Sequence, residues 1–280
     1  MRYDATWRSL FVPESGDTPA PGVRGWNRDA LCAELARLAY YRHEQSDQAR
    51  LDAALAALGF GPATGFSDRR SGTQAFATLD SQGTAWIAWR GTQVSSLIDV
   101  AVDLAAWRTR WEGKARVHAG FRWAYRRLAA PIAVWLAANP HLALVTTGHS
   151  LGAALATLLA ADRPEAELVT VGSPRVGNQA FAQRFVGRSA LRFTTSCDGV
   201  TEVPWQWLGY HHVGEERYID RVGQAHSVPP EPAFRRQDRQ DARRAGRRST
   251  SLQRGELPLR SLTDHAPVNY ISALLGVREG

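Results

Sequence analysis

The chain has 280 residues, which is enough for one large domain whose core needs neither disulfides nor metal ions for stability. Its hydrophobic fraction of 44% and charged fraction of 22% are typical of globular proteins and exclude a mainly disordered or fibrous chain. The net charge of +7 is concentrated in residues 221–260, which hold ten arginines and four acids, so basicity is a local feature.

Helices and strands alternate along the predicted chain. The predicted helices cover residues 27–42, 46–59, 121–138, 151–161 and 268–277. The predicted strands cover residues 74–79, 84–90, 142–147, 167–171 and 191–195. Residues 1–26 are rich in proline, glycine and aromatic residues and are predicted to be a leader that lies over the domain. The alternation predicts one α/β domain over residues 1–280, with a central, mostly parallel sheet flanked by helices.

Residues 229–260 differ from the rest, because they are rich in proline, arginine and glutamine and poor in large apolar residues. We predict an insertion that is flexible or only in part helical. Its arginines allow three interpretations: contact of residues 235–260 with an anionic membrane, contact with nucleic-acid phosphates, or a solvated insertion without a partner. Phe234 is the only aromatic residue among them, so we do not expect nucleic acid as a partner.

We expect neither a membrane span nor a bound cofactor. Asp4 and Arg8 interrupt the apolar stretch that a secretory signal would need, and prolines and glycines divide the uncharged run 128–161 into helix, strand and helix. Cys32 and Cys197 are far apart in the sequence, which indicates a reducing compartment and no metal site. A cytoplasmic or peripheral-membrane location is therefore expected, with signal-independent secretion as a further route.

A nucleophile motif follows the predicted strand 142–147. Gly148-His149-Ser150-Leu151-Gly152 is a G-x-S-x-G elbow between a strand and a buried helix. The sharp turn presents the Ser150 hydroxyl above the sheet, and the glycines leave room for strand and helix to cross. The bare pattern arises by chance in roughly one chain in ten of this length, so the strand and helix around it carry the prediction. We expect the side chain of His149 to point away from the nucleophile.

A serine nucleophile needs a general base, and the base needs a carboxylate that orients it. In α/β-hydrolases the chain order is serine, acid, histidine. Asp198 follows a predicted strand and His265 follows the insertion, so Ser150, Asp198 and His265 are predicted to form a catalytic triad. His211 and His212 remain rivals for the base, because they follow Asp198 closely; packing near the site is the alternative for this pair.

Five pieces in the chain occur in a characteristic order. They are Arg90-Gly91-Thr92; Val117-His118-Ala119-Gly120-Phe121; the elbow at 148–152; Gly172-Ser173-Pro174-Arg175-Val176-Gly177-Asn178; and Asp198-Gly199-Val200 with Val203-Pro204, His212-Val213-Gly214 and Asp264-His265. In this order they resemble the class 3 lipases, the fungal-lipase-like branch of the α/β-hydrolases, from about Ala30 to Tyr270 with the insertion outside.

The resemblance implies an α/β-hydrolase fold with the triad given above. It also implies an oxyanion hole from Thr92 and the backbone N–H of Leu151, whose donors would stabilise the negative charge of the tetrahedral intermediate. The alternative for Thr92 is an ordinary threonine at the end of a strand.

The resemblance further implies a lid over residues 93–116, whose apolar side chains would cover the acyl groove in water. Core packing is the alternative for these side chains. Val100 stands where an aromatic residue often follows the first lid aspartate, Asp99. The residues predicted to form the lid or the acyl pocket are Val94, Leu97, Ile98, Trp107, Trp205 and Trp207.

We therefore expect a lipase, a serine carboxylic-ester hydrolase that cleaves acylglycerol or related glycerolipid esters at a lipid–water interface through an acyl-enzyme. An esterase for short or aromatic acyl chains is an alternative, because the length of the pocket is not encoded in a motif. A lipid- or nucleic-acid-binding protein on an inactive hydrolase scaffold is the alternative from another class. The sequence makes no prediction of oligomeric state.

Overall fold

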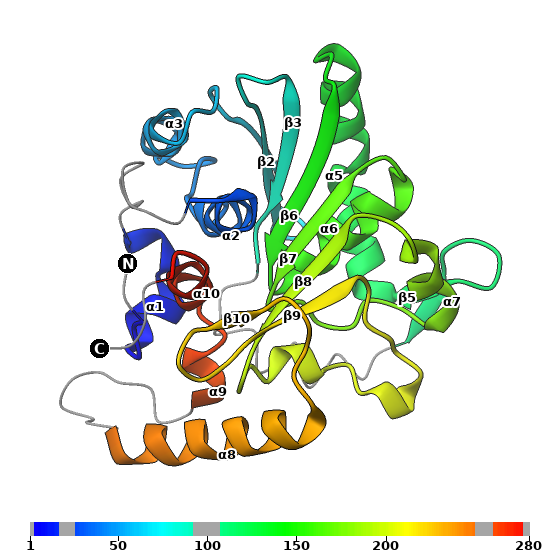
Figure 1. Ribbon diagram of the computed structural model, residues 1–280. Helices are drawn as coiled ribbons and strands as arrows, with labels where there is room; N and C mark the ends of the chain where they lie inside the picture. The colour runs from blue at the N-terminus through cyan, green and yellow to red at the C-terminus, as the bar shows by residue number, and fades with distance from the viewer. Residues whose placement is uncertain (1–2, 17–25, 92–106, 250–259, 277–280) are drawn as a thin grey trace.

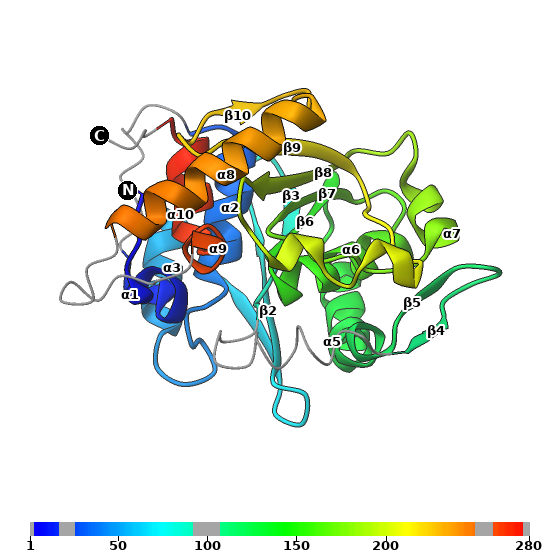
Figure 2. The same ribbon diagram turned by 90° about the horizontal axis from the view of Figure 1, so that it is seen from below.

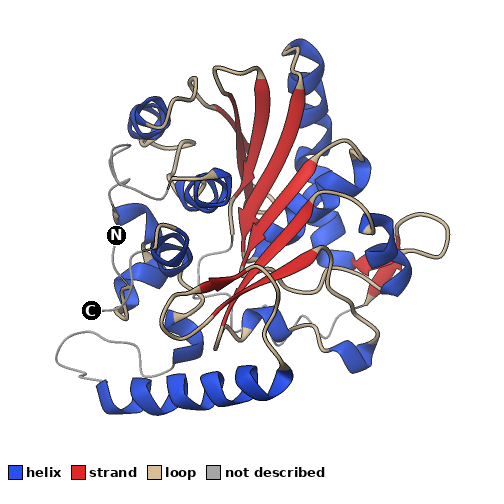
Figure 3. Ribbon diagram, viewed as in Figure 1, coloured by secondary structure: helices blue, strands red, loops and turns tan. Residues whose placement is uncertain are grey.

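The described residues form one large sheet with helices on both of its faces (Figures 1 and 3). The computed structural model describes residues 3–16, 26–91, 107–249 and 260–276. The sheet has eight strands within these residues, in the order β1-β2-β3-β6-β7-β8-β9-β10. They are β1 (Thr64–Asp68), β2 (Thr73–Leu79), β3 (Thr84–Trp89), β6 (Ala143–His149), β7 (Glu167–Val171), β8 (Ala190–Thr195), β9 (Glu215–Ile219) and β10 (Ala225–His226).

The middle of the sheet is parallel and its edges are antiparallel. Strands β3, β6, β7, β8 and β9 pair in parallel, whereas β1, β2 and β10 pair antiparallel. The prediction of a mostly parallel sheet flanked by helices is therefore confirmed. The carboxyl ends of the parallel strands meet at one end of the molecule, at the bottom of Figure 1, where ligands bind in folds of this kind.

Two helical layers cover the sheet. One face carries α2 (Arg28–Leu38), α3 (Gln48–Ala57) and α10 (Pro267–Leu274); the other carries α5 (Ala119–Ala138) and α6 (Leu151–Asp162). Outside the two layers lie α1 (Trp7–Phe11), α7 (Gln179–Ala182), α8 (Pro232–Ser249), α9 (Arg260–Thr263), the short 3-10 turns η1 (Pro13–Ser15), η3 (Gln183–Phe185), η4 (Val200–Glu202) and η5 (Gln206–Leu208), and a hairpin of β4 (Arg108–Arg110) and β5 (Arg116–His118).

Each face of the sheet buries its own hydrophobic cluster, because successive side chains of a strand point to opposite faces. In β3, Ile87 and Trp89 join the cluster under α5 and α6, whereas Trp86 joins the cluster under α2 and α10. Helix α6 is buried on nearly all sides, as its uncharged sequence predicts. The elbow between β6 and α6 is thus held between two packed layers.

Five strands differ from the predicted elements. Strands β1, β9 and β10 were not predicted, because they lie toward the edges of the sheet and their sequences lack a run of large apolar residues. Strands β4 and β5 were not predicted either and have three residues each. Within the Arg-rich insertion, α8 is a helix of 18 residues. None of the helices in the described ranges is long and apolar enough to cross a membrane.

His118 caps α5 and generates a prediction on stability. Its Nδ1 accepts a hydrogen bond from the Phe121 N–H at 3.3 Å, and burial lowers the pKa of His118 to about 4. The pKa of an unfolded histidine is about 6.5, so between these values the unfolded state binds the proton more readily. The free energy of unfolding should therefore fall as pH drops through this window.

We expect His118 to account for a loss of about 2 kcal/mol in the free energy of unfolding between pH 7 and pH 5. His118→Asn keeps a capping side chain but cannot titrate, so the variant should lose this part of the pH dependence. Urea unfolding of both proteins at the two pH values measures the difference. The same pH dependence in wild type and variant would contradict the assignment.

Candidate active site

Ser150 occupies the turn between β6 and α6 in a conformation that few residues other than glycine adopt. Its φ is 58° and its ψ is −126°. A Cβ on Gly148 would lie 2.4 Å from the carbonyl carbon of Gly152, and a Cβ on Gly152 would lie 2.2 Å from the Trp89 oxygen. Both glycines of the motif are therefore required by the close crossing of strand and helix that presents Ser150.

Asp198 and His265, which the sequence assigned to acid and base, lie in contact. His265 Nδ1 is 2.8 Å from Asp198 Oδ2, and both side chains are buried. A carboxylate oxygen accepts, so this contact assigns the proton to Nδ1 and leaves Nε2 free to take one. The pair therefore has the polarity that a general base requires.

The other two atoms of the predicted triad, Ser150 Oγ and His265 Nε2, make no hydrogen bond to described residues. Both atoms are buried. They do not bond to each other in this conformation; such bonds often tighten only when substrate is bound. Transfer of a proton from Ser150 Oγ to His265 Nε2 therefore stays a prediction.

Gly172, at the end of β7, keeps space for the acid and the base. Its φ is 59°, and a Cβ there would lie 3.0 Å from Asp198 Oδ2 and 3.1 Å from His265 Cε1. Any larger residue would meet both side chains. This explains why the glycine-serine-proline motif stands directly after a buried strand.

Tyr270 holds the acid from the opposite side. Its hydroxyl donates to Asp198 Oδ2 at 2.7 Å and accepts from the Thr195 N–H at 3.3 Å, while the Val200 N–H donates to Asp198 Oδ1 at 2.8 Å. The buried carboxylate thus has donors on both oxygens. Sequence reasoning missed Tyr270, because a tyrosine five residues after a histidine belongs to no motif.

His149 contacts the backbone of the base. Its Nε2 lies 2.6 Å from the carbonyl oxygen of His265, and its Nδ1 lies 2.8 Å from the Tyr40 hydroxyl. Burial lowers the pKa of His149 well below its usual value, so the ring is neutral. Its single proton must then sit on Nε2, and Tyr40 donates to Nδ1. The ring fixes the backbone at His265, a role that the sequence did not predict.

The N-terminal residues also support the base. The Tyr3 hydroxyl donates to Asp264 Oδ1 at 2.8 Å, and the Cys197 N–H donates to Asp264 Oδ2 at 3.1 Å. Burial raises the pKa of Asp264, and the neighbouring Arg260 opposes that shift. Asp264, which directly precedes His265, thus links the N-terminal segment to the loop before Asp198.

The two rival histidines have other contacts. The His211 N–H donates to the Gly177 carbonyl oxygen at 2.7 Å. Burial lowers the pKa of His212 well below its usual value, which disfavours the imidazolium that a general base must form. In the described residues Asp198 contacts His265 and not this pair.

Comparisons with known proteins point to one family. The model of the family "Lipase (class 3)" matches residues 86–207. Secreted mono- and diacylglycerol lipase A of Penicillium cyclopium is 44% identical over 90 residues, which is 30% of each chain. The lipase of Rhizopus niveus is 32% identical over 158 residues, 50% of this chain and 40% of the relative. The match spans less than half the length of these relatives.

Solved structures agree with the sequence matches. The crystal structure of the lipase from Rhizopus microsporus var. chinensis aligns with a TM-score of 0.59 and 26% identity, over 78% of this chain and 83% of that one. Over residues 86–207 the chain is similar to the class 3 lipase family. The α/β-hydrolase fold expected from the resemblance is thereby confirmed.

The comparisons also bear on the predicted cellular location. The Penicillium relative is named as a secreted protein. The expectation of a cytoplasmic location therefore has no support.

Part of the predicted oxyanion hole and lid lies outside the described residues. Thr92, Val94, Leu97 and Ile98 belong to this part. Leu151 is the first residue of α6, where a backbone N–H has no carbonyl partner within the helix. This leaves the Leu151 N–H available beside Ser150, and its role in a class 3 lipase oxyanion hole stays a prediction.

The three predicted pocket tryptophans inside the described residues lie at the surface. Trp107 is 87% exposed and Trp207 is 77% exposed, while Trp205 is 45% exposed. The rings of Trp205 and Trp207 stack with their centroids 5.7 Å apart. Their contribution to an acyl pocket stays a prediction.

Replacement of Tyr270 by phenylalanine tests the support of the acid. Tyr270→Phe removes a hydrogen bond to a charged carboxylate, so ester hydrolysis should fall by about 10- to 100-fold while the fold is retained. Tyr125→Phe is the matched control, because Tyr125 donates to Asp162 Oδ2 at 2.6 Å between α5 and α6. Turnover of both variants on a soluble ester, with circular dichroism, checks the prediction. Equal losses in the two variants would refute a specific role for Tyr270.

Proposed function

We propose that this protein is a serine carboxylic-ester hydrolase, a lipase that cleaves acylglycerol or related glycerolipid esters. The observation that carries the proposal is the buried contact of His265 with Asp198 at 2.8 Å, beside a serine held in a strained elbow. The names of relatives support the substrate class. They include mono- and diacylglycerol lipases and a phospholipase A1 of Oryza sativa, 35% identical over 129 residues.

In the first half of the reaction the enzyme is acylated. Ser150 Oγ attacks the ester carbonyl carbon while His265 Nε2 takes the hydroxyl proton. The carbonyl oxygen becomes an oxyanion, for which Thr92 and the Leu151 N–H serve as donors; such a donor contributes about 10²–10³ in turnover. The intermediate then collapses, the alcohol leaves with the proton from His265, and the acyl group remains on Ser150.

In the second half water releases the fatty acid. His265 takes a proton from water, the hydroxide attacks the acyl carbon, and Ser150 regains its proton as the acid departs. Asp198 remains ionised throughout and orients the imidazole. Tyr270 and the Val200 N–H hold that carboxylate in place, so the base returns to the same geometry for each step.

Replacement of the nucleophile tests the mechanism. Ser150→Ala should leave the fold intact and lower hydrolysis of p-nitrophenyl esters by at least about 10⁴-fold, because no other group supplies the attacking oxygen. Labelling by a fluorophosphonate probe should disappear as well. Ser173→Ala removes the hydroxyl of another buried serine that bonds only to Pro174 oxygen among the described residues, and should keep labelling and turnover.

Two outcomes would overturn the proposal. Wild-type rates in Ser150→Ala would exclude this serine as the nucleophile. Intact labelling of wild type combined with hydrolysis of short acyl esters alone, and none of diacylglycerol, would make the protein a short-chain esterase instead.

A further inference from the structure

Helix α8 lies across the end of the molecule at which the parallel strands end (Figures 1 and 2). It packs against the loop that carries the catalytic acid. Arg239 Nε donates to the Ser196 carbonyl oxygen at 3.0 Å, and the same guanidinium pairs with Glu202 in η4. Ser196 stands two residues before Asp198, so α8 borders the site directly.

The inner face of α8 is electrically balanced. Asp238 and Ala242 are buried, and Asp238 Oδ2 accepts from the Tyr218 hydroxyl at 2.7 Å. Arg235 binds both carboxylate oxygens of Glu216 at 3.0 Å. These contacts attach the helix to the domain and pair the charges on its inner face.

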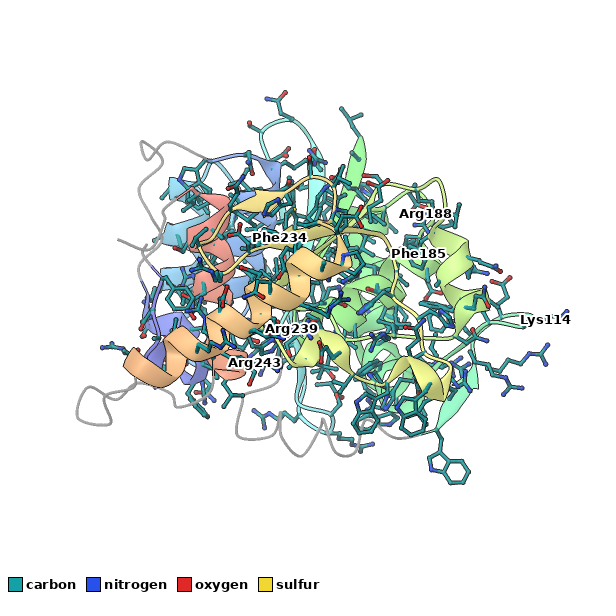
Figure 4. All side chains as sticks on the ribbon, turned by 60° about the horizontal axis from the view of Figure 1, so that its bottom comes forward. Lys114, Phe185, Arg188, Phe234, Arg239 and Arg243 are labelled. Atoms are coloured by element: carbon teal, nitrogen blue, oxygen red, sulfur yellow. The ribbon has the colours of Figure 1, made fainter. Side chains whose placement is uncertain are left out.

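The outer face of α8 carries an excess of arginine, of which Arg244 pairs with Asp241 at 3.7 Å. The helix has seven arginines and two aspartates in its sequence. Arg236 and Arg243 are exposed, and neither has an ion pair within the described ranges. A surface groove of about 410 Å³ follows the flank of the helix where its inner and outer faces meet. Arg239 and Arg243, labelled on α8 in Figure 4, both line it. The groove is lined by Pro232, Arg235, Arg236, Arg239, Gln240 and Arg243, with no carboxylate in this lining. Such a groove suits anionic groups of small size.

Exposed tryptophans extend this surface on the other side of the Asp198 loop. Trp205 and Trp207 stack in and beside η5, which follows η4. Arg108 Nη1 donates to the Gly209 oxygen at 2.9 Å and thereby holds the exposed Trp107 next to the same segment. Tryptophan is the residue most suited to the boundary between water and lipid. Arginines and tryptophans thus flank the site on one end of the molecule.

We propose that this end of the molecule binds the surface of an anionic phospholipid membrane, with Arg236 and Arg243 of α8 on the headgroups and the three tryptophans in the interface. The inference rests on the proposed function, because it places the end of the sheet that carries Ser150 and Asp198 against the lipid substrate. Charge complementarity selects the occupant: cations on a membrane surface attract anionic headgroups, and the tryptophans exclude a purely polar partner.

Vesicle binding by the Ser150→Ala protein tests the proposal without hydrolysis. At about 0.1 M salt it should bind vesicles of phosphatidylcholine with phosphatidylglycerol more than tenfold more tightly than phosphatidylcholine alone, and lose the difference as salt rises. Arg236→Gln with Arg243→Gln should weaken binding to the anionic vesicles by about 30-fold, since each arginine contributes about fivefold. Circular dichroism verifies that the helix remains.

The control removes the same charge elsewhere. Arg50→Gln with Arg126→Gln changes two exposed arginines on α3 and α5, and should alter vesicle binding by less than about twofold. Trp207→Ala should weaken binding to both kinds of vesicle and leave the salt dependence unchanged, because its contribution is apolar.

Three results would overturn the proposal: equal affinity for the two kinds of vesicle, equal losses in the α8 variant and its control, or tighter binding to duplex DNA than to anionic vesicles at equal phosphate concentration. The last would make nucleic acid the ligand. Activity that persists in Ser150→Ala would refute the proposed function and leave the vesicle result standing, so the two failures are distinguishable.

Discussion

A carboxylate buried at the end of a sheet is stable only while donors surround it, and Asp198 draws its donors from separate parts of the chain. His265 and Tyr270 come from the C-terminal segment, and the Val200 N–H comes from the loop of Asp198 itself. Without either side chain, a buried charge would lose a hydrogen bond, which costs about 1.5–3 kcal/mol. The requirement that stabilises Asp198 therefore also fixes the position of His265.

The elbow could be predicted from sequence because its physics is local. A strand, a tight turn and a buried helix follow one another, and Gly148 meets Gly152 within that crossing, although Gly152 itself meets the backbone of Trp89 in β3. The chain order also selected His265 as the partner of Asp198, and these two lie in contact. Tyr270, and the bonds of His149 to Tyr40 and to the backbone, could not be found in this way. They join residues that are distant in sequence, and no spacing or periodicity encodes such pairs.

Strand β9 and helix α8 also depend on contacts between residues that are distant in sequence. In β9, Glu215–Ile219, three of the five residues are charged. The strand still pairs with β8, and Glu216 forms ion pairs with Arg192 and Arg235 on neighbouring elements. Helix α8 has almost no apolar stripe, so periodicity could not distinguish a docked helix from a flexible insertion. Its position depends on tertiary ion pairs and on the buried bond of Asp238 to Tyr218. Polar docking of this kind is visible only when both partners are placed.

Helix periodicity separates the two roles of α8. Residues 235, 238, 239 and 242 turn toward the domain, and Arg239 among them holds the loop before Asp198, while Arg236 and Arg243 are exposed to solvent. Substitutions on the outer face therefore change the charge of the surface without breaking a contact that supports the acid. Because Arg239 bonds to Ser196 and to Glu202, the helix is fixed to the loop on which the acid stands. A membrane bound to the outer face would then meet the end of the sheet that carries Asp198 in one fixed orientation, with no rearrangement of α8 required.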